Sequence, residues 1–396
     1  MADLPRILFL SNEAPHTAAA GAIIFHRLLQ DYPADKLLVV TNSTLPTESG
    51  RLTCRYESLK LPVDRLNRTR LAHWRPILRA LGGSALPRLG RVDALLRGFM
   101  PDVVVTLMQD SWFYDFAARY ARARKLPLLL FIHDLAHGFE PVPSSLKELQ
   151  LRRDRAVFQQ AARRLCVSPG MTSHFQREFG IESEVCLPPR SDAPPTQDPE
   201  ACRLLKTPGR LTLGYAGGLH YGYGEQLLQM LPILRETGTV VELFGSLPSG
   251  KVAALRNATD VLHFNGYSSS PEQAWCELLA RCDAVLQPYL NPPGEHHLQY
   301  RTHFPSKLGD CLSLGLPLLI TGPADASGVV WCLDHPGCAL TVTSPGDLPA
   351  ALKRLRNDAD VRVMIARAAQ IAAAAFASAP LRSHVIASLS NVAATH

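Results

Sequence analysis

The stretch LTLGYAGGLHYGYGEQLLQMLPILRETGTVVELF, residues 211–244, decides the fold class of this chain. It opens with an apolar run over 211–216 that predicts a buried strand, and glycines then mark a turn. Apolar residues at helical spacing predict a helix over 225–236, and a second apolar run follows over 240–244. Strand, glycine turn, helix and strand in this order indicate an open parallel sheet.

The same alternation continues on both sides of this stretch. Towards the C-terminus we expect strands over 261–264, 284–288 and 317–321, and helices over 251–256, 271–281, 305–314 and 361–379. Towards the N-terminus we expect strands over 6–11, 36–41, 102–106, 127–132 and 165–168, and helices over 21–29, 112–123, 146–162 and 171–179. Each half is therefore predicted to be a Rossmann-like, doubly wound α/β domain.

A proline-rich stretch separates the two halves. Residues 187–208, LPPRSDAPPTQDPEACRLLKTP, contain six prolines and little periodicity, which is typical of a linker. The length of 396 residues also favours two domains. We predict an N-terminal domain over 1–190, a linker over 191–210 and a C-terminal domain over 211–396. The terminal helix either stays with the C-terminal domain or packs back on the N-terminal one.

The positive charge of the chain is concentrated in one window. The formal net charge is +6, and residues 51–100 hold eleven Lys or Arg against three acidic residues, a local charge of +8. Basic helices of this kind either rest on an anionic membrane surface or are simply solvated, and both interpretations stay open. Nucleic acid is not expected as a partner, because no aromatic and basic binding platform accompanies the charge.

Composition and cysteine usage bear on the class of protein and its compartment. The residues are 46% hydrophobic and 19% charged, which excludes a disordered chain. The nine cysteines are scattered without a C-x-x-C pair, so neither a disulfide framework nor a zinc ribbon is indicated. We recognise no signal peptide and no run of about 18 apolar residues. A cytoplasmic protein without a spanning helix is the expectation.

Candidate phosphate-binding residues follow the 211–216 strand, because open α/β sheets bind ligands where their strands end. The backbone amides of Gly217 and Gly218 can cradle a phosphate at the start of the next helix. Glycines at such a turn also serve tight packing alone. Both interpretations stay open at this point.

A second group of candidate nucleotide-binding residues lies in the first turns of the helix expected over 305–314. The hydroxyl of Ser306 and the ammonium of Lys307 can bind a diphosphate there, and Asp310 can accept hydrogen bonds from the hydroxyls of a ribose. Ser306 can equally be an N-cap, and Lys307 and Asp310 an ordinary pair along a helix.

Several segments resemble one family when they are taken together. They are GYAGGL, VLHFNGY, ELLARCDAVLQPY and FPSKLGDCLSLGLPLLIT, all within residues 211–325. This part resembles the GT-B glycosyltransferases of the large retaining group called glycosyltransferase family 4, in the variant with a P-S-K motif. The resemblance implies two Rossmann-like domains facing a cleft, with the nucleotide sugar on the C-terminal domain and the acceptor on the N-terminal one.

The resemblance also extends to two short stretches of the N-terminal half. His133 and Asp134 follow the 127–132 strand, where the family has a similar His-Asp with the histidine at the transferring centre. A core histidine bonded to Asp134 is the alternative, and a metal pair of His133 with His137 is disfavoured because no third ligand is spaced for it. Gly21 resembles the glycine-rich first loop that admits the acceptor and approaches the phosphates.

Two features depart from the family pattern. The family places an Arg and a Lys in the loop that opens the C-terminal domain, and Gly218 and Tyr223 occupy the nearest positions here. The family's paired glutamates, eight positions apart, correspond to Thr302 and Asp310. Lys307 therefore has to offset the charge of the diphosphate, with Arg301 as a second possibility.

The resulting hypothesis is a hexosyltransferase-type enzyme that uses a UDP- or GDP-sugar. Departure of a nucleoside diphosphate leaves negative charge on the phosphates, so cations and amides there are the main catalytic requirement. Family resemblance implies retention of configuration, no metal and no cofactor besides the donor. The acceptor is expected to be a glycan, a lipid-linked sugar or a small molecule. A non-hydrolysing nucleotide-sugar epimerase and a non-catalytic nucleotide-binding protein are the alternatives.

Overall fold

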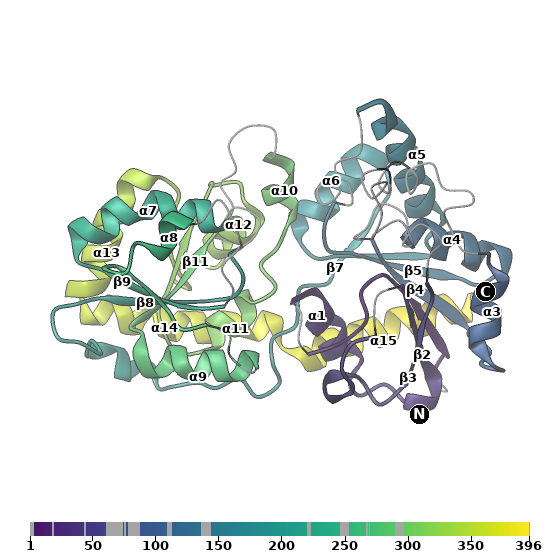
Figure 1. Cartoon of the computed structure of the whole chain (residues 1–396), viewed down its shortest axis with the longest axis horizontal. Helices are drawn as coiled ribbons and strands as arrows, with labels where there is room; N and C mark the ends of the chain where they lie inside the picture. Colours follow the sequence, from purple (N-terminus) through teal and green to yellow (C-terminus); the bar gives the residue numbers. More distant parts are fainter. Residues whose placement is uncertain are drawn as a thin grey trace. The chain divides into compact units, whose positions relative to one another are not determined.

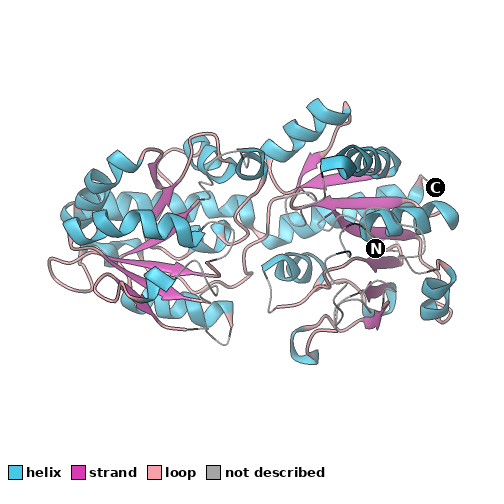
Figure 2. Ribbon diagram, turned by 45° about the horizontal axis from the view of Figure 1, so that its top comes forward, coloured by secondary structure: helices cyan, strands magenta, loops and turns pink. Residues whose placement is uncertain are grey.

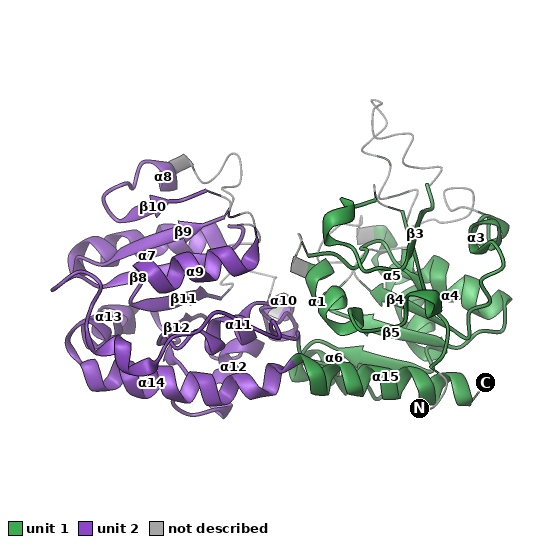
Figure 3. Ribbon diagram, turned by 90° about the horizontal axis from the view of Figure 1, so that it is seen from below, with its two compact units in different colours: residues 1–187, 378–396 green, residues 188–377 purple. Residues whose placement is uncertain are grey.

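The structure of this chain, a computed structural model, divides into two compact units (Figures 1 and 3). Unit 1 comprises residues 1–187 and 378–396, and unit 2 comprises residues 188–377. The structure describes residues 4–17, 20–42, 45–60, 74, 77, 88–108, 113–135, 144–219, 223–245, 253–266, 268, 270–289 and 297–395. In each unit, helices flank a parallel sheet on both faces (Figure 2).

The sheet of unit 1 has, within the described residues, seven parallel strands in the order β3-β2-β1-β4-β5-β6-β7. Chain order reverses between β1 and β4, as in a doubly wound fold. The central strands are buried apolar runs, as expected for a parallel sheet covered on both faces. The strands are β1 (Ile7–Leu10), β2 (Leu37–Thr41), β3 (Arg55–Ser58), β4 (Val103–Met108), β5 (Leu128–Ile132), β6 (Arg163–Cys166) and β7 (Glu184–Val185).

One face of this sheet is covered by the first and the last helix of the unit. Phe25 of α1 lies 5.1 Å from Phe9 and 5.1 Å from Phe131, measured between ring centres. Val385 and Leu389 of α15 are buried in the same cluster. The helices of unit 1 are α1 (Ala20–Leu29), α3 (Gly90–Leu96), α4 (Phe113–Ala123), α5 (Ser144–Gln160), α6 (Pro169–Phe179) and α15 (Ser378–Ala394), with 3-10 turns η1 (Ala34–Lys36) and η2 (Glu48–Gly50).

Unit 2 repeats this architecture with six described parallel strands in the order β10-β9-β8-β11-β12-β13. The reversal lies between β8 and β11. The register pairs Leu213 with Val241 on one side and with Ala284 on the other. The strands are β8 (Thr212–Ala216), β9 (Val240–Phe244), β10 (Leu262–Phe264), β11 (Ala284–Pro288), β12 (Leu318–Thr321) and β13 (Leu340–Val342).

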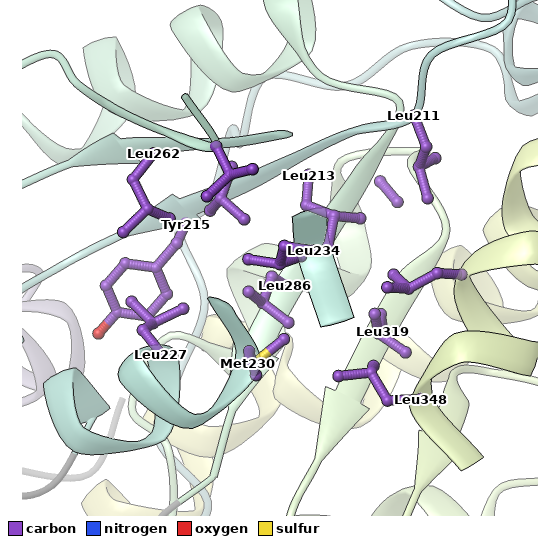
Figure 4. Close-up of a cluster of buried hydrophobic side chains, with 14 of the residues drawn as sticks. Leu211, Leu213, Tyr215, Leu227, Met230, Leu234, Leu262, Leu286, Leu319 and Leu348 are labelled. Carbon is purple, nitrogen blue, oxygen red and sulfur yellow. The ribbon is translucent and has the colours of Figure 1, made fainter. Parts of the chain in front are cut away.

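The main core of unit 2 lies between this sheet and the helices α7 and α13 (Figure 4). Leu213 and Leu286 of the sheet pack there against Leu227 and Met230 of α7. The helices are α7 (Tyr223–Thr237), α8 (Ala253–Arg256), α9 (Pro271–Arg281), α10 (His297–Thr302), α11 (Leu308–Ser313), α12 (Ser327–Asp334), α13 (Leu348–Asn357) and α14 (Ala359–Ala372), with 3-10 turns η7 (Pro199–Arg203), η8 (Pro345–Asp347) and η9 (Ala373–Phe376).

The proline-rich segment does not behave as a linker in the structure. Residues 191–210 lie in unit 2, and the first unit ends at Leu187. The reason is a buried arginine: Arg362 of α14 donates hydrogen bonds to the carbonyls of Cys202 and Arg203, at 2.6 and 2.7 Å. The prolines shape an irregular segment whose carbonyls find partners in the unit.

The long terminal helix expected over 361–379 is two helices. The 3-10 turn η9 separates α14 from α15, and the two helices belong to different units. Pro380 explains the break, because proline is tolerated in the first turn of α15 but not inside a continuous helix. By length and composition alone, the stretch Ala359–Ala394 is long and apolar enough to cross a membrane. Both of its helices nevertheless bury side chains in the units.

Candidate functional site

On one side of the reversal point of unit 2, three neighbouring strands end at glycines. Gly217, Gly245 and Gly266 follow the neighbouring strands β8, β9 and β10, with φ values of 136°, 156° and 77°. A Cβ on Gly245 would lie 2.0 Å from the carbonyl oxygen of Gly217, so the two strand ends touch through bare backbone. Such an edge admits the close approach of a ligand to the backbone. The N–H groups of Gly217 and Gly245 donate hydrogen bonds to the carbonyls of Phe244 and Gly266, both at 2.8 Å, so the Gly217 amide serves the sheet and is not available for the phosphate cradle expected from the sequence.

The structure separates the two roles proposed for glycines near β8. A Cβ on Gly214 would lie 1.7 Å from a methyl group of Leu278, so Gly214 serves the packing of α9 on the sheet. Gly217 instead has left-handed backbone, and a Cβ there would lie 3.0 Å from Lys307 Nζ. Gly218 accepts a hydrogen bond at its carbonyl from Tyr215 Oη, at 2.8 Å. Gly214 therefore serves packing, whereas Gly217 lies beside Lys307.

Lys307 is brought to the same edge from the segment before α11. Its Nζ donates a hydrogen bond to the carbonyl of Ala216 at 2.6 Å and lies 3.7 Å from the centre of the Tyr215 ring. The desolvated surroundings lower the pKa of Lys307 to about 8. The side chain keeps a part-exposed surface. Lys307 and Gly217, which are 90 residues apart in the sequence, thus meet at one point.

Two aromatic residues and a histidine that the sequence did not single out as ligands surround this lysine. The ring centre of Tyr223 lies 5.8 Å from Lys307 Nζ and 6.3 Å from the centre of the Tyr215 ring. Tyr223 Oη is 3.5 Å from Nε2 of His303. Of these three residues, the sequence pointed only to Tyr223, because it stands near the position of the lysine in the resembled family.

The remaining candidates of unit 2 have different surroundings. Asp310 is buried, and its Oδ1 accepts a hydrogen bond from the backbone N–H of Ser191 at 2.8 Å. Ser306 lies in the turn before α11 and is partly exposed. Arg301 is exposed and forms an ion pair with Asp325 at 2.6 Å. Of these candidates, Arg301 has its charge offset by a partner.

In unit 1 the sequence candidates His133 and Asp134 directly follow β5. The ring of His133 is buried and stacks on Phe25 of α1, with ring centres 4.9 Å apart and an angle of 11°. The rings of Phe131 and His133 are nearly perpendicular, with ring centres 6.4 Å apart. Asp134 is partly exposed. His137 lies outside the described residues.

Gly21, in the first turn of α1, lies against a carboxylate of its own unit. A Cβ on Gly21 would lie 2.5 Å from Oε2 and 2.8 Å from Oε1 of Glu13. Glu13 follows β1, so the residue type at position 21 permits this close approach of the carboxylate to the helix N-terminus. Glu13 was not recognised from the sequence, because its contact becomes visible only when β1 and α1 are placed together.

Other chemistry-bearing groups are accounted for by the fold. The nine cysteines are all described and all free. The triplet Asp358-Ala359-Asp360 serves α14, because Asp358 caps its N-terminus and Asp360 forms an ion pair with Arg203 at 2.6 Å. A hollow of about 50 Å³ between α7 and the end of β13 has room for a few waters only.

Part of the basic window is described. Arg55 donates hydrogen bonds to the carbonyls of Leu95 and Leu96 at the end of α3, and Trp74 is exposed. Residues 61–73, 75–76 and 78–87 lie outside the described residues. The described residues therefore do not distinguish a membrane-binding surface from a solvated face in this window.

Comparison with solved structures shows the architecture. HepE from Anabaena, solved in complex with UDP, superposes with a TM-score of 0.69 over 98% of this chain and 100% of that chain at 15% identity. The fold is GT-B. The GT-B neighbours also include sucrose-phosphate synthase from Thermosynechococcus elongatus, with a TM-score of 0.69, 13% identity and coverage of 99% and 100% of the two chains. WaaG, a glycosyltransferase involved in lipopolysaccharide biosynthesis, has a TM-score of 0.60, 16% identity and coverage of 96% and 98%.

Sequence comparison gives one further finding for this GT-B chain. Residues 26–190 match the family model of the glycosyl transferase 4-like domain. No curated protein matches the chain. HepE has also been solved with UDP-glucose, at 14% identity. The matched residues lie in the N-terminal half and include His133 and Asp134, whereas the longer segments of the resemblance lie in unit 2.

Proposed function

We propose that this chain is a glycosyltransferase that moves a sugar from a UDP- or GDP-sugar to a glycan, lipid-linked or small-molecule acceptor. The reaction proceeds with retention, without metal and without a further cofactor. The observation that carries the proposal is the meeting of Lys307 with Gly217 at the end of β8, beside the first turn of α7. The family model over residues 26–190 and the GT-B fold support it.

The residues of unit 2 then bind the donor. The Lys307 ammonium and the amide of Gly218 offset the negative charge that develops on the diphosphate when the sugar departs. Gly217, whose own N–H is bonded to the Phe244 carbonyl, contributes by letting the phosphates approach the backbone closely. Ser306 adds a hydroxyl beside them, and Asp310 accepts hydrogen bonds from the ribose. Arg301 is a weaker candidate for the phosphates, because Asp325 already pairs with it.

The residues of unit 1 then face the acceptor and the transferred sugar. His133 and Asp134 lie at the end of β5, where parallel sheets bind ligands, and Gly21 lies in the first turn of α1. Stacking on Phe25 fixes the plane of the His133 ring, which suits a group that positions a sugar hydroxyl. For a variant His133→Ala we expect retained nucleotide binding and lost transfer.

The setting proposed for this reaction is the cytoplasm, at the inner face of the membrane. The support is the local charge of +8 over residues 51–100, which suits contact with anionic lipid. A lipid-linked acceptor would be presented at the same surface. Sedimentation with vesicles of anionic and of neutral lipid tests this part, and equal binding to both would refute it.

A thermal-shift screen with UDP, GDP, ADP, CMP and dTDP tests the proposed function. A ligand that binds only the folded state raises its stability by mass action. We expect a clear rise with UDP or GDP, and Lys307→Ala is expected to remove it. Absence of a rise with every nucleotide would contradict the proposal. A C2-epimerised donor formed without acceptor would indicate an epimerase, and nucleotide binding without transfer or hydrolysis would indicate a non-catalytic protein.

A further inference from the structure

Two side chains from distant elements meet beside Lys307 in unit 2. Tyr223, the first residue of α7, has its hydroxyl oxygen 3.5 Å from Nε2 of His303, which lies between α10 and α11. The ring centre of Tyr223 is 5.8 Å from Lys307 Nζ. The three polar groups therefore gather at the carboxyl edge of the sheet, next to the glycine end of β8.

The backbone that carries His303 is held from two sides. The carbonyl of His303 accepts hydrogen bonds from Tyr289 Oη and from Ser327 Oγ. A Cβ on Gly328 would lie 2.7 Å from the Tyr289 ring and 3.0 Å from Pro305, so the segment that follows His303 is closely packed. Because its backbone is bonded and packed in this way, the imidazole has a defined position beside Tyr223.

The charges near Lys307 indicate why the uncharged hydroxyl of Tyr223 would help to bind a diphosphate there. Lys307 is the cation that contacts the Gly217 strand end through the Ala216 carbonyl. Arg301 is exposed and paired with Asp325. A diphosphate brings more negative charge than one lysine offsets, so hydrogen-bond donors must satisfy its other oxygens. A tyrosine hydroxyl oriented by a histidine is such a donor.

We propose that the hydroxyl of Tyr223 donates a hydrogen bond to an oxygen of the donor's diphosphate. His303 orients this hydroxyl by donating a hydrogen bond from its Nε2–H to Tyr223 Oη. The inference rests on the proposed function, because it concerns the diphosphate of the same nucleotide sugar. Tyr223 is then a binding residue and His303 a positioning residue that acts through it. No covalent bond changes, and Lys307 remains the charged partner of the phosphates.

Titration of the full chain with UDP and with uridine tests the pair, with GDP and guanosine as the second series. Tyr223→Phe removes only the hydroxyl and is expected to weaken UDP binding about tenfold, because a hydrogen bond to a charged group is lost. Uridine has no phosphate, so its binding is expected to stay unchanged. His303→Ala is expected to weaken UDP binding to a similar extent, and His303→Gln, which keeps a donor N–H, to restore part of it.

A double variant separates positioning from a merely structural role. Tyr223→Phe combined with His303→Ala is expected to bind UDP no more weakly than Tyr223→Phe alone, because His303 acts only through the hydroxyl. His335→Ala serves as the matched control, since this histidine of the same unit bonds the Trp331 carbonyl at 2.7 Å. Its UDP affinity is expected to equal that of the wild type.

The failure of this inference and the failure of the proposed function have different signatures. If the wild type binds neither UDP nor GDP, the proposed function is wrong. If the wild type binds UDP and Tyr223→Phe binds it equally well, only the inference is wrong. Additive losses in the double variant would refute the role of His303 as a positioning residue, as would a loss of UDP binding in Arg301→Ala that neither Tyr223→Phe nor His303→Ala shows.

Discussion

At the scale of single residues, Lys307 makes nucleotide binding depend on pH. Its desolvated surroundings lower the pKa to about 8, so the free protein loses the ammonium as the pH rises through this value. A bound diphosphate favours the charged form. We therefore expect UDP or GDP affinity to be constant below pH 7 and to fall about tenfold for each unit above pH 8.

Calorimetric titration between pH 6.5 and 9.5 measures this dependence. Lys307→Arg is the informative variant, because arginine stays charged throughout the range. Where Lys307→Arg binds at all, its affinity should not fall above pH 8. A wild-type affinity that is equal at pH 7 and pH 9.5 would remove Lys307 from the diphosphate site.

A buried carboxyl group in unit 1 links stability to pH in the acid range. Asp154 of α5 accepts hydrogen bonds from Tyr114 and from Gln150, and burial raises its pKa to about 6. The folded chain thus binds a proton that the unfolded chain releases near pH 4. The contribution of Asp154 to the unfolding free energy is therefore greatest below pH 4. It falls by about 3 kcal/mol as the pH rises through 6.

Urea denaturation of the wild type and of Asp154→Asn between pH 4 and 7 isolates this contribution. Asparagine has no titrating proton, so the difference in unfolding free energy between the two proteins should grow in favour of Asn as the pH rises from 4 to 6. Parallel pH profiles of the two proteins would show that Asp154 has an ordinary pKa.

The residue scale also shows what the sequence alone can reveal about a site. Lys307 and Gly217 were predicted because each lies in a local motif that carries its own physical reason. Tyr223 and His303 are in contact although they are 80 residues apart in the sequence. No local sequence pattern predicts a contact of this kind. Asp310 was found as a candidate, but its bond to the Ser191 amide depends on a segment that resembled a linker.

At the scale of elements, the sequence predicted the buried strands and the edge strand β10, but it missed the other three edge strands. The bounds of β9, α9 and β11 agree with the prediction, because apolar runs and caps mark them. The missed strands β3, β7 and β13 all lie at sheet edges. They are two to four residues long, and edge positions do not require a continuous apolar run.

A single arginine ties three elements of unit 2 together. Arg362 of α14 is buried and donates hydrogen bonds to the carbonyls of Cys202 and Arg203 in η7. It also donates to the carbonyls of Leu355 and Arg356 near the end of α13. Removing it leaves several buried carbonyls without donors. We expect Arg362→Ala to lower the unfolding free energy by about 3–5 kcal/mol.

The denaturation midpoint in urea, with an unchanged slope, measures this loss. Arg367→Ala is the matched control on the same helix, because Arg367 is exposed and pairs with Glu200 at the surface. It should change the unfolding free energy by less than about 1 kcal/mol. Equal effects of the two variants would show that the buried hydrogen bonds of Arg362 stabilise unit 2 no more than a surface ion pair does.

At the scale of the whole molecule, the chain leaves unit 1 at Leu187 and returns to it at Ser378. The last helix therefore completes the core of the first domain. Leu389 of α15 is buried in the cluster that contains Phe9 and Phe25, whereas Leu286 lies in the core of unit 2. A substitution near the C-terminus should thus weaken the N-terminal half of the chain, and not the unit that precedes it in sequence.

Hydrogen exchange of Leu389→Ala and Leu286→Ala tests this division. Each substitution should cost about 3 kcal/mol in its own core. We expect Leu389→Ala to lower protection of the amides in β1, β4 and β5 while those of β8, β9 and β11 keep theirs, and Leu286→Ala to do the reverse. Because the residues proposed to bind the diphosphate all lie in unit 2, Leu389→Ala should also retain wild-type nucleotide affinity. Loss of protection in both units in either variant would mean that the two cores unfold as one.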